Sequence, residues 1–122
     1  MSEILILELE GLPPTVNHLY RNFRGRRYKT TSGRKYQERT AELIRREWKN
    51  QLACKQPIEL RITFITSDRR KWDIDNRVKA LQDCLSMAGV IEDDRQINIL
   101  HVEREYGSRT ATLIEVNTID TA

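Results

Sequence analysis

The chain has 122 residues and a net charge of +3, and 39% of its residues are hydrophobic and 32% are charged. This size fits a single domain over residues 1–122 with one modest core, and the positive charge suits a polyanionic partner. No apolar run is long enough for a transmembrane helix and the first residues lack a secretory-signal pattern, so we expect no membrane partner and no export.

The first half of the chain predicts a strand, a long loop and a helix. Residues 4–10 are a short apolar run that grades into alternation, which is typical of a strand. Residues 15–33 show little periodicity and many turn-forming residues, so we expect a long loop that is functional or mobile. A helix is predicted over residues 32–51, with Ser32 as a cap. Its apolar stripe contains Tyr36, Thr40, Leu43, Ile44 and Trp48.

The second half predicts a strand, a helix and two more strands. Within residues 57–66, the apolar residues Ile58, Leu60, Ile62 and Phe64 alternate with polar ones, which indicates a strand with one buried face. Residues 73–88 carry a helical apolar stripe, and Gly89 is a natural stop. Apolar residues within 97–102 and 111–116 predict two final strands, joined as a hairpin by Gly107 and Ser108. The fold class is therefore α/β (α+β), with the order β-α-β-α-β-β and a small mixed sheet of about four strands packed by two helices.

The cysteine count limits the chemistry. Cys54 and Cys84 are the only cysteines, so a disulfide framework and a four-cysteine zinc site are excluded. Free thiols fit a reducing compartment, and we expect a cytoplasmic protein.

Acidic residues gather where the second helix begins. Asp73 and Asp75 lie at the junction of loop and helix, and Lys79 follows Asp75 by four positions, so these two share a helix face. Asp83 extends that face into a row of carboxylate, amine and carboxylate. Taken alone, an aspartate at a helix start is ordinarily a cap, and Asp75 with Lys79 is ordinarily a surface ion pair.

A second acidic group, Glu92-Asp93-Asp94, follows the helix directly. If the chain doubles back, Asp94 faces Asp73 and Asp75, and three carboxylates in one site need a cation to offset their repulsion. Mg²⁺ suits such oxygen ligands, with Mn²⁺ as a possible substitute, and it can activate water beside a phosphate. Lys79 would then stabilise the charge that develops on an attacked phosphodiester. Taken alone, the acidic triplet is ordinarily a solvated turn.

Basic residues gather elsewhere. Residues 21–49 contain eleven Arg or Lys and three Glu, a local charge of +8, which leaves −5 on the rest of the chain. This separation is the footprint expected for binding a phosphate backbone, and interleaved aromatic residues can stack on bases. The predicted DNA contacts are Asn17, Tyr20, Arg21, Arg24, Arg26, Arg27, Lys29, Arg69, Arg70 and Lys71.

Two motifs together carry a family resemblance. The D-x-D-N-x-x-K pattern of residues 73–79 and the D-D-x-Q pattern of residues 93–96 resemble the RusA family of Holliday junction resolvases. Residues 12–17 and the basic segment 20–29 are also similar to that family, although Val16 stands where the family often has a second asparagine beside Asn17. The resemblance implies the catalytic residues Asp73, Asp75, Lys79 and Asp94, with Asp83 and Asp93 as possible additional acidic residues.

The resemblance further implies a homodimer that binds four-way DNA junctions and cuts two opposed strands with Mg²⁺, in recombination and repair. Symmetry supports the dimer independently, because one small domain holds one site and two cuts need two sites. We expect no small-molecule substrate. Two other functions stay open at this point: a non-catalytic nucleic-acid-binding module and a metal-dependent ribonuclease.

Overall fold

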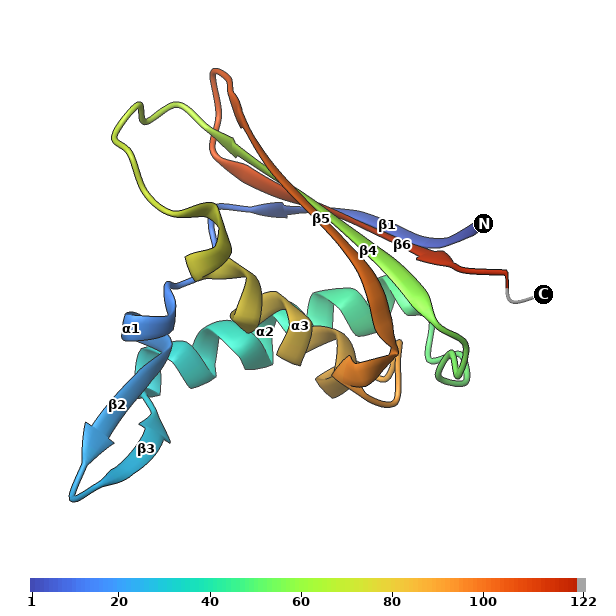
Figure 1. Ribbon diagram of the computed structural model, residues 1–122, viewed down its shortest axis with the longest axis horizontal. Coiled ribbons are helices and arrows are strands. Elements are labelled where there is room, and N and C mark those ends of the chain that lie inside the picture. Colours follow the sequence, from blue (N-terminus) through green and yellow to red (C-terminus); the bar gives the residue numbers. More distant parts are fainter. Residues whose placement is uncertain (121–122) are drawn as a thin grey trace.

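The computed structural model describes residues 1–120, and its main feature is a four-stranded sheet covered on one face by two helices (Figure 1). The sheet order is β1-β6-β4-β5, and a second sheet is the two-stranded hairpin β2–β3. The elements are β1 (Ser2–Glu10), α1 (Val16–Leu19), β2 (Tyr20–Phe23), β3 (Arg26–Lys29), α2 (Thr31–Trp48), β4 (Ile58–Thr66), η1 (Ile74–Arg77), α3 (Val78–Met87), η2 (Asp94–Gln96), β5 (Ile97–Tyr106) and β6 (Ala111–Thr118).

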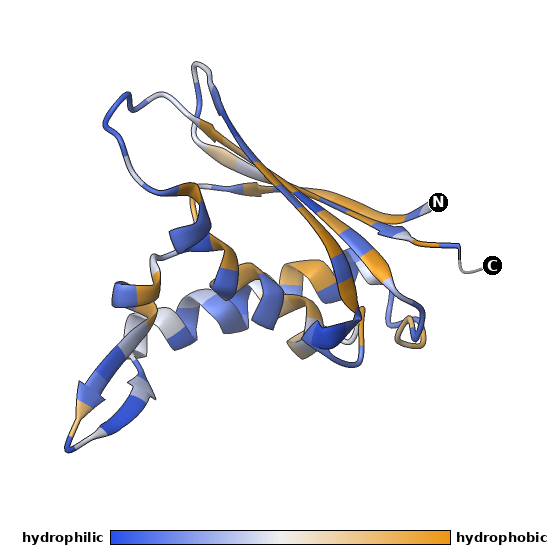
Figure 2. Cartoon of the chain, viewed as in Figure 1, coloured by the Kyte–Doolittle hydropathy of each residue, from blue (hydrophilic) through white to orange (hydrophobic). Residues whose placement is uncertain are grey.

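The core forms around β4. Its alternating residues Ile58, Leu60, Ile62 and Phe64 are each 0% exposed, as the predicted one-sided strand requires. Hydrophobic side chains from β1, β6, α2 and α3 join them in one cluster, and Figure 2 shows hydrophobic residues concentrated on the strands and helices rather than on the β2–β3 hairpin. The predicted α+β class with a mixed sheet is confirmed.

The predicted hairpin of the last two strands is wrong. β4 lies between β5 and β6, parallel to the former and antiparallel to the latter. β4 is buried almost throughout and so takes the centre, whereas β5 is largely exposed and occupies an edge. The connection crosses the end of β4 at Gly107, whose N–H donates to Thr66 O at 3.0 Å. A Cβ at Gly107 would lie 3.1 Å from Ile65 Cγ2, a tight contact that glycine avoids.

The first long helix differs from its prediction at both ends and on its buried face. Thr30, not Ser32, is the cap, because its Oγ1 accepts from Gly33 N at 2.9 Å. The helix ends at Trp48, where Lys49 turns into the left-handed region with φ 58°. Leu43 is 47% exposed, whereas Gln37 and Ala41 are buried, because the stripe passes through residues 33, 37, 40, 41, 44 and 48.

The predicted long loop over residues 15–33 is also wrong. It folds into α1 and the β2–β3 hairpin, which projects away from the sheet (Figure 1). Arg24 and Gly25 both have positive φ, 51° and 72°, which suits the tight turn of a two-residue hairpin. Every residue from 21 to 28 is exposed, so neither face of the hairpin carries a hydrophobic pattern that sequence reasoning can detect. No helix within residues 1–120 is long and apolar enough to cross a membrane.

Candidate functional site

Asp83 is the meeting point of three elements. Its carboxylate accepts from Lys79 Nζ at 2.9 Å, one turn earlier on α3, and from Gln37 Nε2 of α2 at 3.2 Å. The hydroxyl of Tyr20, at the base of the hairpin, donates to Asp83 Oδ2 at 3.5 Å, and Lys29 Nζ lies 3.9 Å from the same oxygen. The side chain is only 15% exposed. One carboxylate therefore connects α2, α3 and the hairpin.

Lys79 also reaches the second acidic group. Its ammonium lies 3.6 Å from Asp94 Oδ2, and Asp94 Oδ1 accepts from Ser86 Oγ at 2.8 Å. The hydrogen bond to Asp83 raises the pKa of Lys79, so the ammonium stays charged at neutral pH. The chain doubles back and brings Asp94 to α3, where Lys79 and Ser86 hold it.

The predicted pairing of Asp75 with Lys79 is not found. Residues 74–77 form a 3₁₀ turn, and α3 begins only at Val78, so the four-residue spacing of an α-helix does not apply. Lys79 pairs with Asp83 and Asp94 instead. The row of carboxylate, amine and carboxylate exists, but Asp94 replaces Asp75 in it.

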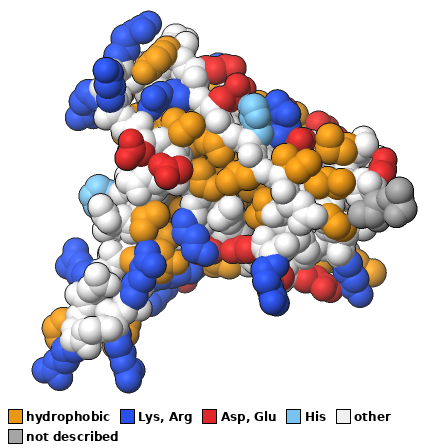
Figure 3. Space-filling view, viewed as in Figure 1, with side chains coloured by type: hydrophobic (Ala, Val, Ile, Leu, Met, Phe, Trp, Pro, Cys, Tyr) orange, Lys and Arg blue, Asp and Glu red, His pale blue; other side chains and the backbone are white. Residues whose placement is uncertain are grey.

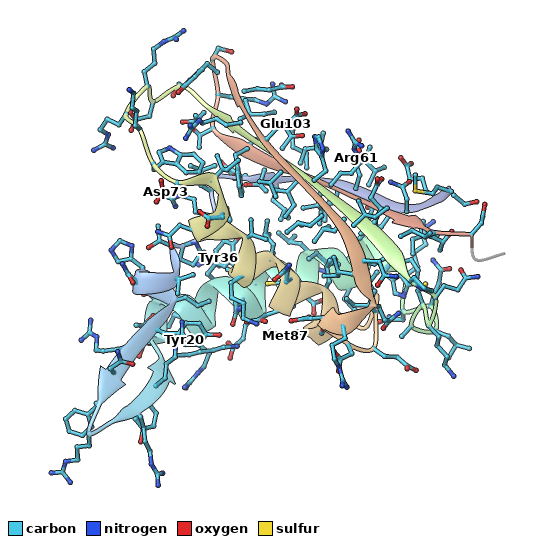
Figure 4. The ribbon with its side chains drawn as sticks, viewed as in Figure 1. Tyr20, Tyr36, Arg61, Asp73, Met87 and Glu103 are labelled. Carbon is cyan, nitrogen blue, oxygen red and sulfur yellow. The ribbon has the colours of Figure 1, made fainter. Side chains whose placement is uncertain are left out.

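Asp73 and Asp75 lie on the segment that enters α3, and both are exposed. Asp73 makes no capping hydrogen bond with its side chain, so the capping interpretation does not account for it. Figure 4 shows Asp73 ahead of α3, toward the same end of the molecule as Tyr20. Within residues 1–120, no group of three or more His, Cys, Asp or Glu side chains lies close enough to hold a metal ion.

The segment that carries Asp73 is held by the neighbouring Trp72. The Trp72 ring lies 4.9 Å from the guanidinium of Arg77 and 4.8 Å from that of Arg104, and it meets Phe64 edge-on at 5.5 Å. Arg104 Nη1 also donates to Trp72 O at 2.7 Å. The backbone immediately before Asp73 is therefore anchored to β5 and to the core.

Asp93 has a structural role in its own turn. It caps η2 by accepting from Arg95 N at 2.8 Å, and Gln96 completes a capping box. Hydrogen bonds from Arg95 lower the pKa of Asp93. The carboxylates of Asp83, Glu92, Asp93 and Asp94 nevertheless line one open pocket of about 380 Å³, together with Lys29, Ser86 and Met87.

The predicted DNA contacts fall on two basic arms. One arm is the β2–β3 hairpin, with Arg21, Arg24, Arg26, Arg27 and Lys29. The other is the loop after β4, with Arg69, Arg70 and Lys71. Figure 3 shows Lys and Arg gathered on both arms, with acidic side chains between them.

Several of these residues have partners within the chain. Arg27 stacks on the Tyr20 ring at 3.9 Å, Arg69 lies 4.8 Å from the Tyr106 ring, and Arg70 forms an exposed ion pair with Asp68. Lys71 is exposed, and so is Asn17 on α1.

Gln37 is the site residue that sequence reasoning missed. It is 1% exposed, and its Nε2 donates to Ala80 O at 3.3 Å as well as to Asp83. The sequence carried no signal for it, because the predicted stripe ran through Tyr36 rather than Gln37, and only the packed helix shows a buried amide that requires polar partners.

Comparison with known proteins agrees with this architecture. The family model described as Endodeoxyribonuclease RusA matches residues 10–117. A crossover junction endodeoxyribonuclease RusA of Escherichia coli (strain K12) is 35% identical over 85 residues, which are 70% of this chain and 70% of that protein. The protein of the same name from Enterobacteria phage 82 is 35% identical over the same shares, and that of Shigella sonnei (strain Ss046) is 34% identical. The chain therefore belongs to the RusA family of endodeoxyribonucleases.

Proposed function

We propose that this protein is a crossover junction endodeoxyribonuclease that resolves four-way DNA junctions. The observations that carry the proposal are the two carboxylates, Asp83 and Asp94, around Lys79 and the two basic arms with acidic side chains between them (Figure 3). Cationic arms hold a phosphate backbone, and the carboxylate-rich centre between them supplies the groups that hydrolysis requires. The names of the family and of its curated relatives support the same activity.

Lys79 is the proposed electrostatic catalyst. Two carboxylates fix its ammonium, at 2.9 Å from Asp83 and 3.6 Å from Asp94, and it is 44% exposed on the side chain. A phosphodiester gains negative charge on its non-bridging oxygens when water attacks. An ammonium that is already in place stabilises this charge without reorganisation.

Mg²⁺ is the proposed cofactor, with Mn²⁺ as its substitute and Asp73, Asp75 and Asp94 as its ligands. The donor chemistry fits, because all three offer carboxylate oxygens, and Asp73 and Asp75 are exposed. In residues 1–120 these carboxylates are not assembled into a ligand group, so binding of the ion would have to bring them together. The ion would supply an activated water and neutralise charge on the phosphate.

A homodimer is the proposed working form. Its proposed role is in recombination and repair, and its proposed location is the cytoplasm. One chain holds one acidic site around Lys79, and cutting two opposed strands needs two such sites. Free thiols at Cys54 and Cys84 suit a reducing compartment. Light scattering with and without junction DNA tests the dimer, and a monomer in both samples would contradict it.

The deciding experiment uses a labelled four-way junction and a linear duplex of matched sequence, each with Mg²⁺, Mn²⁺ or EDTA. Paired nicks on the junction alone, and only with a divalent ion, would support the proposal. Tight junction binding without nicks would favour the non-catalytic binding module, in which the ion pairs of Lys79 are purely structural. Cleavage of an RNA substrate in preference to the junction would favour the ribonuclease.

A further inference from the structure

The two faces of the β2–β3 hairpin differ in what they contact. Strand pairing places Tyr20 opposite Lys29 on one face, and Arg21 opposite Tyr28 on the other. On the first face, Tyr20 already carries Arg27 on its ring and donates to Asp83. That face is turned inward, toward α3.

The second face presents aromatic rings to solvent. Phe23 is 63% exposed and Tyr28 is 50% exposed, and strand register makes them diagonal neighbours on this face. Arg24 lies 5.3 Å from the Phe23 ring. Neither ring belongs to the hydrophobic core or to the partly buried residues packed against it. Two exposed rings on a small hairpin add nothing to the core, so a binding role explains them better than a structural one.

These rings border a pocket of about 550 Å³ between the hairpin and the start of α2. Arg21 supplies positive charge to its wall, and Thr31 and Ser32 supply hydroxyls. Lys29 also lines the pocket, but its ammonium points to the other face, 3.9 Å from Asp83 Oδ2. The volume lies within the usual range of small-ligand sites, roughly 300–1,000 Å³. Rings that can stack, cations and hydroxyl donors together match the base, phosphate and sugar of a nucleotide.

We propose that this pocket binds one unpaired nucleotide of the DNA, with its base stacked on Phe23 and Tyr28 and its phosphate held by Arg21. The inference rests on the proposed function, since a branch point is where a duplex most easily yields an unpaired base. A paired base keeps both of its faces stacked and cannot enter such a pocket without the cost of unstacking. The pocket thus favours branched DNA over linear duplex.

Lys29 connects this pocket to the candidate catalytic group. It lines both the aromatic pocket and the acidic pocket that contains Asp83 and Asp94. A nucleotide held against Lys29 therefore brings the neighbouring phosphate of its strand toward Lys79. Capture of an unpaired base would in this way select which phosphodiester is cut.

The test uses the wild-type protein and a short single-stranded DNA with one 2-aminopurine, whose fluorescence falls when it stacks on an aromatic ring. The double variant Phe23→Leu with Tyr28→Leu should lose this quenching and bind the strand about tenfold more weakly, within the roughly 5- to 150-fold range of one stacked base. Phe23→Tyr keeps a ring at this position and should therefore retain the quenching. Leu43→Ala removes a 47% exposed apolar side chain on the outer face of α2 and should also change nothing.

The outcomes separate this inference from the proposed function. Unchanged quenching and affinity in the double variant would overturn the pocket assignment, even if the wild-type protein cuts junctions. Lost quenching in the double variant, with quenching retained in Phe23→Tyr, would support the pocket even if wild type cut no junction. Loss of linear-duplex binding to the same degree as single-strand binding would overturn it too, because the variant would then have damaged the whole arm.

Discussion

Asp83→Ala should destabilise the fold as well as the site. The change removes the carboxylate that accepts from Gln37 Nε2 and, at 2.9 Å, from Lys79 Nζ. The Gln37 side chain is only 1% exposed, so water cannot replace the lost acceptor. Gln37 keeps its bond to Ala80 O, and Lys79 is 44% exposed, so the two losses are worth about 1 kcal/mol each. We expect the free energy of unfolding to fall by about 2 kcal/mol in urea titrations.

Two further variants make this measurement decisive. Asp83→Asn keeps one acceptor oxygen but loses the charge, so its loss of stability should lie between wild type and Asp83→Ala. Glu42→Ala removes an exposed acid that pairs with Arg45 and Arg46 on the surface of α2, and it should cost much less. If Asp83→Ala were no more destabilising than Glu42→Ala, Asp83 would not hold the three elements together.

Three other changes test separate parts of the molecule. Asp75→Asn should abolish junction cutting while gel-shift affinity is kept or rises, because it removes a proposed ion ligand and a negative charge near phosphate; combined loss of binding and folding would instead indicate a structural residue. Replacing Arg24, Arg26 and Arg27 by Ala should weaken binding and lower the slope of log affinity against log salt by roughly two to three, and an unchanged slope would exclude the hairpin as a backbone contact. Burial raises the pKa of Cys84 from 9.0 to about 12, so the unfolded thiol ionises first and the free energy of unfolding should fall as pH rises from 9 to 12. Urea midpoints at pH 8 and 10 should show a smaller fall in Cys84→Ala, and an equal fall would assign the effect to other groups.

The strands of the large sheet were predictable because alternate residues along them are buried, which leaves an apolar–polar alternation in the sequence. β4 shows this most clearly, with Ile58, Leu60, Ile62 and Phe64 inside. The β2–β3 hairpin was not predictable, because residues 21–28 are all exposed and only Gly25 marks its turn. The partner of β6 was missed for another reason. Adjacent strands pair by default, but here β4 has the more apolar sequence and takes the place that β5 would fill in a hairpin.

The candidate site was predictable in composition but not in pairing. The carboxylates and Lys79 stand out because two acidic groups, at residues 73–75 and 92–94, flank one predicted helix. Their pairing depends on the point at which the α-helix begins, and the 3₁₀ turn at residues 74–77 moves Asp75 off the face of Lys79. Buried partners such as Gln37 become visible only when α2 packs against α3.

The base and the tip of the hairpin serve different purposes. At the base, Leu19 is 0% exposed, its carbonyl accepts from Thr30 N at 2.9 Å, and a Cβ on Gly33 would lie only 3.0 Å from that carbonyl oxygen. The start of α2 is therefore packed tightly against α1, and Lys29, directly before Thr30, is kept beside Asp83. The tip at Arg24 is exposed and has no such packing. In the proposed complex with a junction, this packed base would keep Lys29 at a constant position relative to Asp83 and Lys79, whichever way the exposed tip meets the DNA.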